Sequence, residues 1–260
     1  MSRARLEAAQ AYLRQQWRSW RLTVSSDAFS YHGERFVNLI ARPPTFPPGP
    51  RLIIGAHLDT VPGTPGADDN ASGVAAMLEA SRIIADIAPA LPVEFVSFAL
   101  EELGLVGSEH YAAAVQRHEV LGMLSLEMVG FTESEGLQHY PWFLRGRFPS
   151  IGNYLGLAAN DRSKRLLDAV AAAMRQVPDL PVEAMVIPRN GWLLPESRLS
   201  DHAPFWDRGY PALLVTDTAF FRNPHYHQPS DTVDTLDLPF LEKVTQGLVA
   251  TIQALVTPRV

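Results

Sequence analysis

Five short segments carry side chains that can bind a metal ion or move a proton. The first is His57-Leu58-Asp59, which directly follows the apolar run Leu52–Ala56. In an extended chain, residues two apart point the same way, so the Asp59 carboxylate can fix the tautomer of His57 and turn its other nitrogen toward a metal. The alternative is a histidine with an ordinary hydrogen-bond partner at a strand end.

Pairs of adjacent acids make up two further segments. Asp68 and Asp69 stand just before a helical apolar pattern, where such residues often cap a helix but can also bridge two cations. Glu101 and Glu102 follow an apolar run, and their like charges repel unless a cation or a shared proton relieves them. One glutamate could then bind a metal while the other acts on water as a general base, whereas a solvated loop would need neither role.

The last two segments lie further along the chain. Glu127 is an acid within an apolar strand pattern, and a buried acid needs a partner, either a metal ion or a basic side chain. His225, His227 and Asp231 fall within seven residues beside prolines, which suits either a rigid ligand-bearing loop or a surface turn. Each segment has an ordinary structural explanation, so a functional site requires that the fold bring several of them together.

Composition limits the chemistry and the partners. The chain has 260 residues, 47% of them hydrophobic and 19% charged, which is typical of a folded globular protein. Its formal charge of −6 offers no basic excess for nucleic acid, and no apolar run approaches the roughly 20 residues of a membrane span. With no cysteine, a metal must be held by His, Asp and Glu. The charged, amphipathic start without a leader pattern predicts a cytoplasmic protein.

Apolar runs alternate with helical patterns along the whole chain. We expect strands at 37–41, 52–56, 93–100, 122–129, 182–187 and 212–216. We expect helices at 4–19, 72–87, 107–118, 162–176, 202–208 and 239–256, with an irregular functional loop over 130–161. This alternation predicts a single α/β domain over residues 1–260, with a mostly parallel sheet covered on both faces. The five segments follow predicted strands, so they should meet at one rim, where an oxygen and nitrogen ligand set suits a pair of divalent ions such as zinc.

The order of these segments resembles the co-catalytic two-zinc aminopeptidases, a family that includes aminopeptidase Y, bacterial leucine aminopeptidases, glutamate carboxypeptidase and glutaminyl cyclase. The matching motifs are His-x-Asp, Gly-Ala-Asp-Asp-Asn-x-Ser-Gly, Glu-Glu, a carboxylate on a later strand, and His before x-Pro-x-Asp-Thr. The resemblance covers roughly residues 36–256, and the segments Ser200-Asp201-His202 and Gly209–Ala212 also fit it. It implies a three-layer α/β/α sandwich with a mixed, mostly parallel central sheet of the zinc-exopeptidase type.

The resemblance also implies a ligand set of two divalent metal ions, zinc in this family. Asp69 would bridge the two ions. His57 and Glu127 would complete one site, and Glu102 and His227 would complete the other. Glu127 stands where many aminopeptidases of the family have Asp, and its extra methylene group can still reach a metal.

Catalytic roles follow from the same resemblance. Glu101 would be the general base and acid, and Asp59 would orient His57. Tyr226 resembles a tyrosine that hydrogen-bonds the developing oxyanion in some relatives. Asp68 and His225 are neighbours of ligands and receive no metal role.

The function that the resemblance implies is an aminopeptidase that releases N-terminal residues from short peptides. The same centre could instead serve a carboxypeptidase, an amidohydrolase of acylated amino acids or a glutaminyl cyclase. A third class is a non-catalytic interaction domain on the same fold, although every expected catalytic position here is chemically competent. An acid that holds a free amine, or an arginine that holds a carboxylate, would separate the peptidase alternatives. The sequence does not indicate an oligomeric state.

Overall fold

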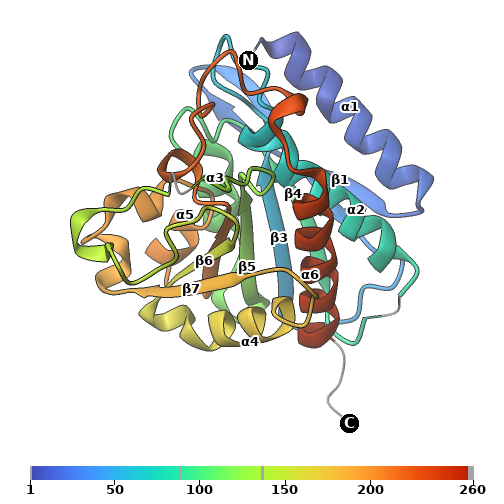
Figure 1. Ribbon diagram of the computed structural model, residues 1–260. Coiled ribbons are helices and arrows are strands. Elements are labelled where there is room, and N and C mark those ends of the chain that lie inside the picture. Colours follow the sequence, from blue (N-terminus) through green and yellow to red (C-terminus); the bar gives the residue numbers. More distant parts are fainter. Residues whose placement is uncertain (1, 88, 136–137, 257–260) are drawn as a thin grey trace.

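An eight-stranded sheet forms the centre of the computed structural model, with helices on both of its faces (Figure 1). The structure describes residues 2–87, 89–135 and 138–256. The strands are β1 (Thr23–Tyr31), β2 (Glu34–Arg42), β3 (Arg51–His57), β4 (Val93–Phe98), β5 (Val120–Glu127), β6 (Leu155–Asn160), β7 (Val182–Ile187) and β8 (Ala212–Thr216). The α-helices of this part of the chain are α1 (Arg3–Ser19), α2 (Gly73–Ala85), α3 (Val106–Ala114), α4 (Lys164–Met174), α5 (Ala203–Asp207) and α6 (Leu238–Val256).

The sheet is mixed, with a parallel centre. The strand order is β1-β2-β4-β3-β5-β8-β6-β7, and the four adjacent strands β4, β3, β5 and β8 run parallel. The hairpin β1–β2 joins β4 in antiparallel fashion, and β6 runs antiparallel to β8 while β7 pairs parallel with β6. The carboxyl ends of the four central strands therefore meet at one rim. The predicted α/β/α fold with a mixed, mostly parallel sheet is confirmed.

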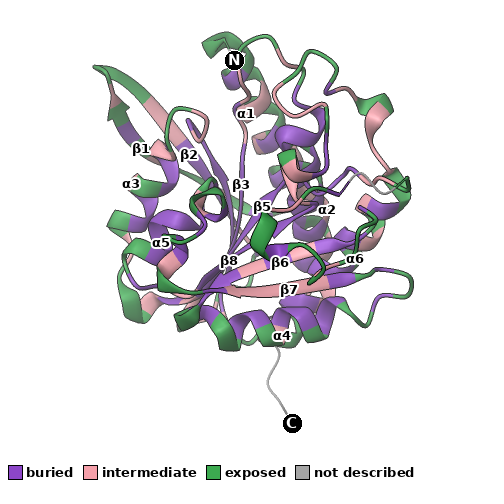
Figure 2. Ribbon diagram, turned by 60° about the vertical axis from the view of Figure 1, so that its left-hand side comes forward, coloured by how far each residue is buried: buried purple, intermediate pink, exposed green. Residues whose placement is uncertain are grey.

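Side chains of the central strands alternate between two cores. Leu52 and Ile54 of β3 pack into the core that holds side chains of α1, α2, α4 and α6. Ile53 points to the opposite face, into the core with α3 and α5. All three are completely buried, which explains why this strand has an apolar run without alternation (Figure 2).

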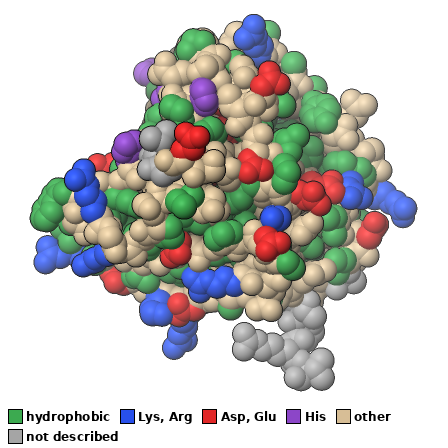
Figure 3. Space-filling view, viewed as in Figure 1, with side chains coloured by type: hydrophobic (Ala, Val, Ile, Leu, Met, Phe, Trp, Pro, Cys, Tyr) green, Lys and Arg blue, Asp and Glu red, His purple; other side chains and the backbone are tan. Residues whose placement is uncertain are grey.

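The first helix packs onto the body of the protein. Leu6, Leu13 and Trp17 of α1 are buried, as the spacing within 4–19 predicts, and Trp20 packs at the edge of the same core. The indole Nε1 of Trp17 donates to the hydroxyl of Ser81 on α2 at 2.9 Å. None of the described helices is both long enough and apolar enough to span a membrane. On the face drawn in Figure 3, Lys and Arg side chains are scattered among acids.

Two strands were absent from the sequence prediction. β1 carries a largely polar sequence, TVSSDAFSY, and all but one of its residues are at least partly exposed, so it lacks an apolar run. β6 lies inside the stretch 130–161 that was predicted as an irregular loop, and that prediction is wrong for Leu155–Asn160. Its small residues, LGLAAN, give little local preference for a strand, and its pairing with β7 and β8 decides its conformation.

The N-terminus of α6 is capped by Asp237, the residue just before the helix. Its Oδ1 accepts the backbone N–H of Phe240 at 3.0 Å, and its Oδ2 accepts the hydroxyl of Thr132 at 2.6 Å. Asp237 therefore caps the helix and ties it to the chain that leaves β5.

We expect Asp237→Ala to lower the free energy of unfolding by about 1–2 kcal/mol, because one helix N–H and the Thr132 hydroxyl lose their acceptor. Urea denaturation measures this change. Asp237→Asn is the matched control and should lose less, because an amide oxygen can still cap. Equal stability of wild type and Asp237→Ala would contradict the capping role.

Candidate metal centre

The rim at the carboxyl ends of the parallel strands gathers all five predicted ligands. His57 ends β3 and Glu127 ends β5. Asp69 lies in the helical turn Ala67–Ser72 before α2, and Glu102 follows β4. His227 lies in the loop that follows β8, so residues up to 170 positions apart in the sequence converge on one site.

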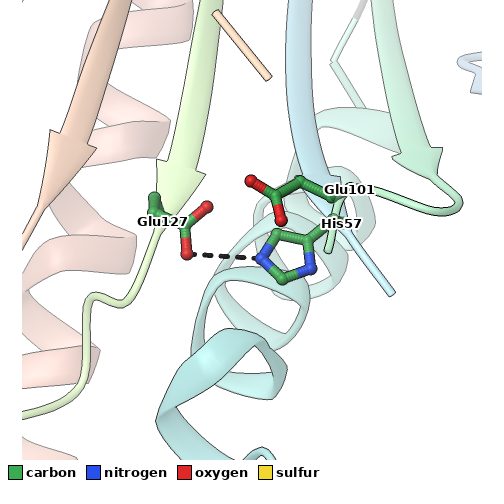
Figure 4. Close-up of side chains that lie close together, drawn as sticks. All are labelled: His57, Glu101 and Glu127. Atoms are coloured by element: carbon green, nitrogen blue, oxygen red, sulfur yellow. Dashed lines mark hydrogen bonds and ion pairs between the residues drawn. The ribbon is translucent and has the colours of Figure 1, made fainter. Parts of the chain in front are cut away.

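His57 presents one ring nitrogen to this site. Its Nδ1 lies 3.0 Å from the carbonyl oxygen of Asp59, which leaves Nε2 facing the carboxylates. Nε2 is 3.2 Å from Glu127 Oε1 and 3.3 Å from Asp69 Oδ1. Glu101 projects from the loop after β4 toward the gap between His57 and Glu127 (Figure 4).

Asp69 lies between the two histidines. Its Oδ1 faces His57, and its Oδ2 lies 3.0 Å from Nε2 of His227. The same Nε2 of His227 is 3.3 Å from Glu102 Oε2. One carboxylate oxygen on each side is the arrangement that a ligand shared by two cations requires.

The donors form two groups, each compact enough to hold a metal ion. In one group, ligand atoms of His57, Glu101 and Glu127 lie within 4.8 Å of one another. In the other, the same holds for Asp69, Glu102 and His227. Imidazole and carboxylate donors without sulfur suit zinc and similar divalent ions.

The carboxylate of Asp59 has a different contact from the expected one. Its Oδ1 is 4.0 Å from Nδ1 of His57, and the short contact to that nitrogen comes from the Asp59 carbonyl instead. The two carboxylate oxygens accept the backbone N–H groups of Glu101 and Glu102, each at 3.1 Å. These N–H groups lie beyond the end of β4 and have no strand partner, so the carboxylate satisfies them and holds the Glu101–Glu102 segment in place.

Two residues that the sequence analysis names without a role support the predicted ligands. Asp231 accepts the backbone N–H groups of Asp68 and Asp69 at 2.8 and 3.1 Å, which ties the two ligand loops together. Ser200 donates its hydroxyl to Glu127 Oε2 at 2.8 Å. Both belong to segments that resemble the family motifs, but no spacing rule indicates what they contact.

The neighbours of the ligands point elsewhere, apart from Tyr226. The Tyr226 ring stacks on His227 with centroids 3.7 Å apart and also lines the cleft beside the site. His225 Nδ1 lies 2.8 Å from Ser230 Oγ. Asp68 accepts from Gly130 N and Asn223 Nδ2 at 3.0 and 2.7 Å, so neither Asp68 nor His225 enters the ligand groups.

Negative charge dominates the electrostatics of the site. Burial raises the pKa of Glu101 well above its ordinary value, and the carboxylates of Glu127 and Asp201 add to the rise while His57 opposes it. Burial and the Asp69 charge raise the pKa of Glu102 to about 7. For His57, burial lowers the pKa, but the charges of Glu127 and Glu101 outweigh it and hold the pKa well above the ordinary value. Bound cations would relieve the same excess of charge that otherwise retains protons.

A large cleft opens from the predicted metal ligands. It encloses about 1030 Å³ of space, part of it open to solvent, and its walls are mainly apolar. Apart from the ligands and Glu101, its lining includes two more acids, Glu183 and Glu196. Among the described residues that line it, none is lysine or arginine.

The fold and the grouped histidines and acids at the ends of parallel strands point to a hydrolase of the metallopeptidase class. The chain belongs to peptidase family M28, whose profile matches residues 38–252. Membership of this family makes it a metallopeptidase, as the order of the motifs predicts.

Individual relatives agree with this assignment. The uncharacterized protein YfbL of Escherichia coli is 33% identical over 94% of this chain and 79% of its own length. Aminopeptidase YwaD of Bacillus subtilis is 25% identical over 85% of this chain, which spans only 44% of that protein. The crystal structure of the LapA aminopeptidase of Legionella pneumophila has a TM-score of 0.75 at 24% identity, covering 97% of this chain and 65% of its own. Solved glutaminyl cyclases share the fold at 18% identity, so fold alone does not separate the two activities.

The pKa shifts predict how the metal-free protein responds to pH. Burial also raises the pKa of Asp201 to about 7, so the folded chain retains protons on Glu102 and Asp201 that the unfolded chain has released. Its stability should therefore fall as pH rises from about 4.5 through 7. The raised pKa of His57 acts in the same direction, because its stabilisation is lost as pH rises through the folded value. The pKa of Asp69, lowered to about 2, has the opposite sign, but its contribution is already complete above the ordinary value of 3.8.

We expect the melting temperature of chelator-treated protein to be a few degrees higher at about pH 5.5 than at about pH 7.5. A divalent cation such as zinc should reduce this difference, because it replaces the retained protons. Differential scanning calorimetry with and without zinc measures both effects. A metal-free protein that is more stable at the higher pH would contradict this account of the charges.

Proposed function

We propose that the protein is a zinc-dependent aminopeptidase that hydrolyses the N-terminal bond of short peptides at a two-metal centre. The observation that carries the proposal is the Asp69 carboxylate, with one oxygen toward His57 and the other toward His227. A carboxylate in this position can bridge two cations. Zinc is supported by the donor set and by the motifs of the family.

The roles of the ligands follow from their contacts. His57 and Glu127, whose ligand atoms lie 3.2 Å apart, would hold one ion together with Asp69. Glu102 and His227, 3.3 Å apart, would hold the other. Glu101 faces the first pair, with a carboxylate oxygen within 4.8 Å of their ligand atoms. The order of the family motifs assigns this glutamate to proton transfer and its neighbour Glu102 to the metal.

The chemistry divides between the ions and the chain. Two divalent ions, when bound, would activate water and polarise the substrate carbonyl. Glu101 would take a proton from water and deliver it to the leaving amine, and its raised pKa suits a group that must both accept and donate. Asp59 would position Glu101, because its carboxylate accepts the backbone N–H of Glu101. Burial and nearby carboxylates raise the pKa of Tyr226, so its hydroxyl stays protonated and can donate to the oxyanion.

The charge of the cleft favours a free amine over a free carboxylate. A carboxypeptidase needs a cation to hold the C-terminal carboxylate, and no lysine or arginine is found among the described lining residues. An N-terminal ammonium group would instead meet several carboxylates. Two of the relatives named above are aminopeptidases, which agrees with this orientation.

Several sequence predictions stay predictions. These are the cytoplasmic location, the single domain over residues 1–260, the small peptide or amide substrate, and the absence of nucleic-acid and membrane partners.

A substrate panel tests the proposed activity. We expect zinc-loaded protein to hydrolyse peptides with a free N-terminus and to leave N-acylated copies intact, because only the free amine meets the acidic cleft. A chelator should abolish hydrolysis and lower the melting temperature, since the carboxylates then lose their counter-charge. Cleavage of the acylated peptides, cyclisation of N-terminal glutamine or release of C-terminal residues would each replace the proposal with another activity.

Two matched variants separate the proposed base from a proposed ligand. Glu101→Gln should keep its metal content but lose turnover by about 10²–10⁴-fold, because the amide cannot accept a proton. Glu102→Gln should lose metal, because the amide is a weaker ligand. Metal analysis and kcat on the same preparations check both. Near-normal turnover in Glu101→Gln would remove Glu101 from the role of base.

A further inference from the structure

The cleft continues beyond the metal ligands, across the half of the sheet formed by β8, β6 and β7. The strand register marks its direction, since Glu127 pairs with Thr216, Thr216 with Gly156, and Gly156 with Glu183. All four residues line the cleft. Because neighbouring strands lie about 4.8 Å apart, three steps place the backbone of Glu183 about 14 Å from that of Glu127.

Small residues keep the floor of this extension open. Gly156 has no side chain, and Ala158 on the same strand has only a methyl group. Tyr140, Leu144 and Phe148, from the loop before β6, also line it. The result is a largely apolar trough that leads from the predicted metal ligands to the edge strand β7.

Glu183 places a carboxylate at the far end of this trough. It is half-buried, and among the described residues no ion pair to Glu183 is found. Its charge acts on two phenols of the cleft, on which the Arg222 guanidinium acts in the opposite direction. Burial raises the pKa of Tyr140 and Tyr154, and the Glu183 charge adds to both shifts. A half-buried acid that forms no ion pair with the described residues, at the end of an apolar channel, is suited to bind a cation from a ligand.

We propose that Glu183 is a specificity determinant that favours substrates with lysine or arginine as the N-terminal residue. This inference rests on the proposed aminopeptidase function. The methylene groups of such a side chain would lie along the apolar trough, and its charged end would pair with Glu183. The α-amino group cannot fill this role, because it is two bonds from the scissile carbonyl and therefore stays beside the metal ligands.

A lysine substrate and its uncharged analogue provide the test. The zinc-loaded enzyme is assayed with the 4-nitroanilides of lysine and norleucine, which differ mainly in the terminal ammonium group. We expect wild type to favour lysine in kcat/KM. Glu183→Gln should lower kcat/KM for lysine about tenfold and change that for norleucine by less than about twofold, because only the charge is lost.

Glu242→Gln is the matched control. It makes the same charge change on the exposed surface of α6, on the opposite side of the sheet, and should leave the lysine-to-norleucine ratio unchanged. Metal content and circular dichroism verify that each variant keeps its centre and fold. If Glu183→Gln does not fold, the salt dependence of the wild-type enzyme serves as the test. Added salt should lower the lysine-to-norleucine ratio of kcat/KM, because it screens the half-exposed pair between the substrate ammonium group and Glu183.

The outcomes separate the two proposals. The role of Glu183 would be overturned if folded Glu183→Gln kept the wild-type lysine-to-norleucine ratio of kcat/KM. It would also be overturned if wild type did not favour lysine and its ratio did not change with salt. Either result would leave the aminopeptidase function intact. A failure to release any N-terminal residue would instead overturn the proposed function itself.

Discussion

The structure depends on one electrostatic constraint, the concentration of carboxylates in a mostly buried space at the ends of parallel strands. Asp69, Glu101, Glu102 and Glu127 face one another there, with the imidazoles of His57 and His227 between them. Such a group is stable only if protons or cations balance it. The raised pKa values of the glutamates mean that protons balance the charge in the metal-free protein. In a two-metal centre, the cations would balance it instead.

Hydrogen bonds to the backbone hold these mutually repelling carboxylates in position. Asp59 binds the N–H groups of Glu101 and Glu102, and Asp231 binds those of Asp68 and Asp69. Each of these carboxylates satisfies two donors in a loop that has no sheet partner. The acids that surround the centre therefore do more than add charge, because they determine where the ligand loops lie.

The change of strand direction between β8 and β6 creates the cleft beside the predicted metal ligands. β6 runs antiparallel to β8 and brings the short residues Gly156 and Ala158 next to β8, which is itself the neighbour of the Glu127-bearing strand β5. The helices α3 and α5 pack on this face nearer the centre of the sheet, whereas the β6–β7 side faces the loop with Tyr140 and Phe148. A cleft remains where a helix would otherwise fill the space. The ions would supply the chemistry, and this cleft would select the substrate.

Much of the site could be predicted from sequence because its chemistry is local to short motifs. Acids such as Glu127, embedded in an apolar strand, or Glu101 and Glu102, directly after one, stand out in sequence since they need a partner. The order of these motifs then predicted the fold and the family. β1 and β6 escaped because polar edge strands and strands of small residues have no distinctive local pattern, and only pairing with neighbours makes them strands.

Only the tertiary structure decided the contacts between segments that lie far apart in the chain. The sequence indicated that Asp59 stands beside His57, but the folded loop uses its carbonyl for the histidine and its carboxylate for Glu101 and Glu102. Nothing in the sequence connects Glu183 with Glu127. The two residues lie at the ends of one line across the sheet only because of the register of β5, β8, β6 and β7. Residue type and spacing determine which groups can react, whereas strand order and register determine which of them meet, because pairing energies are summed over the whole sheet.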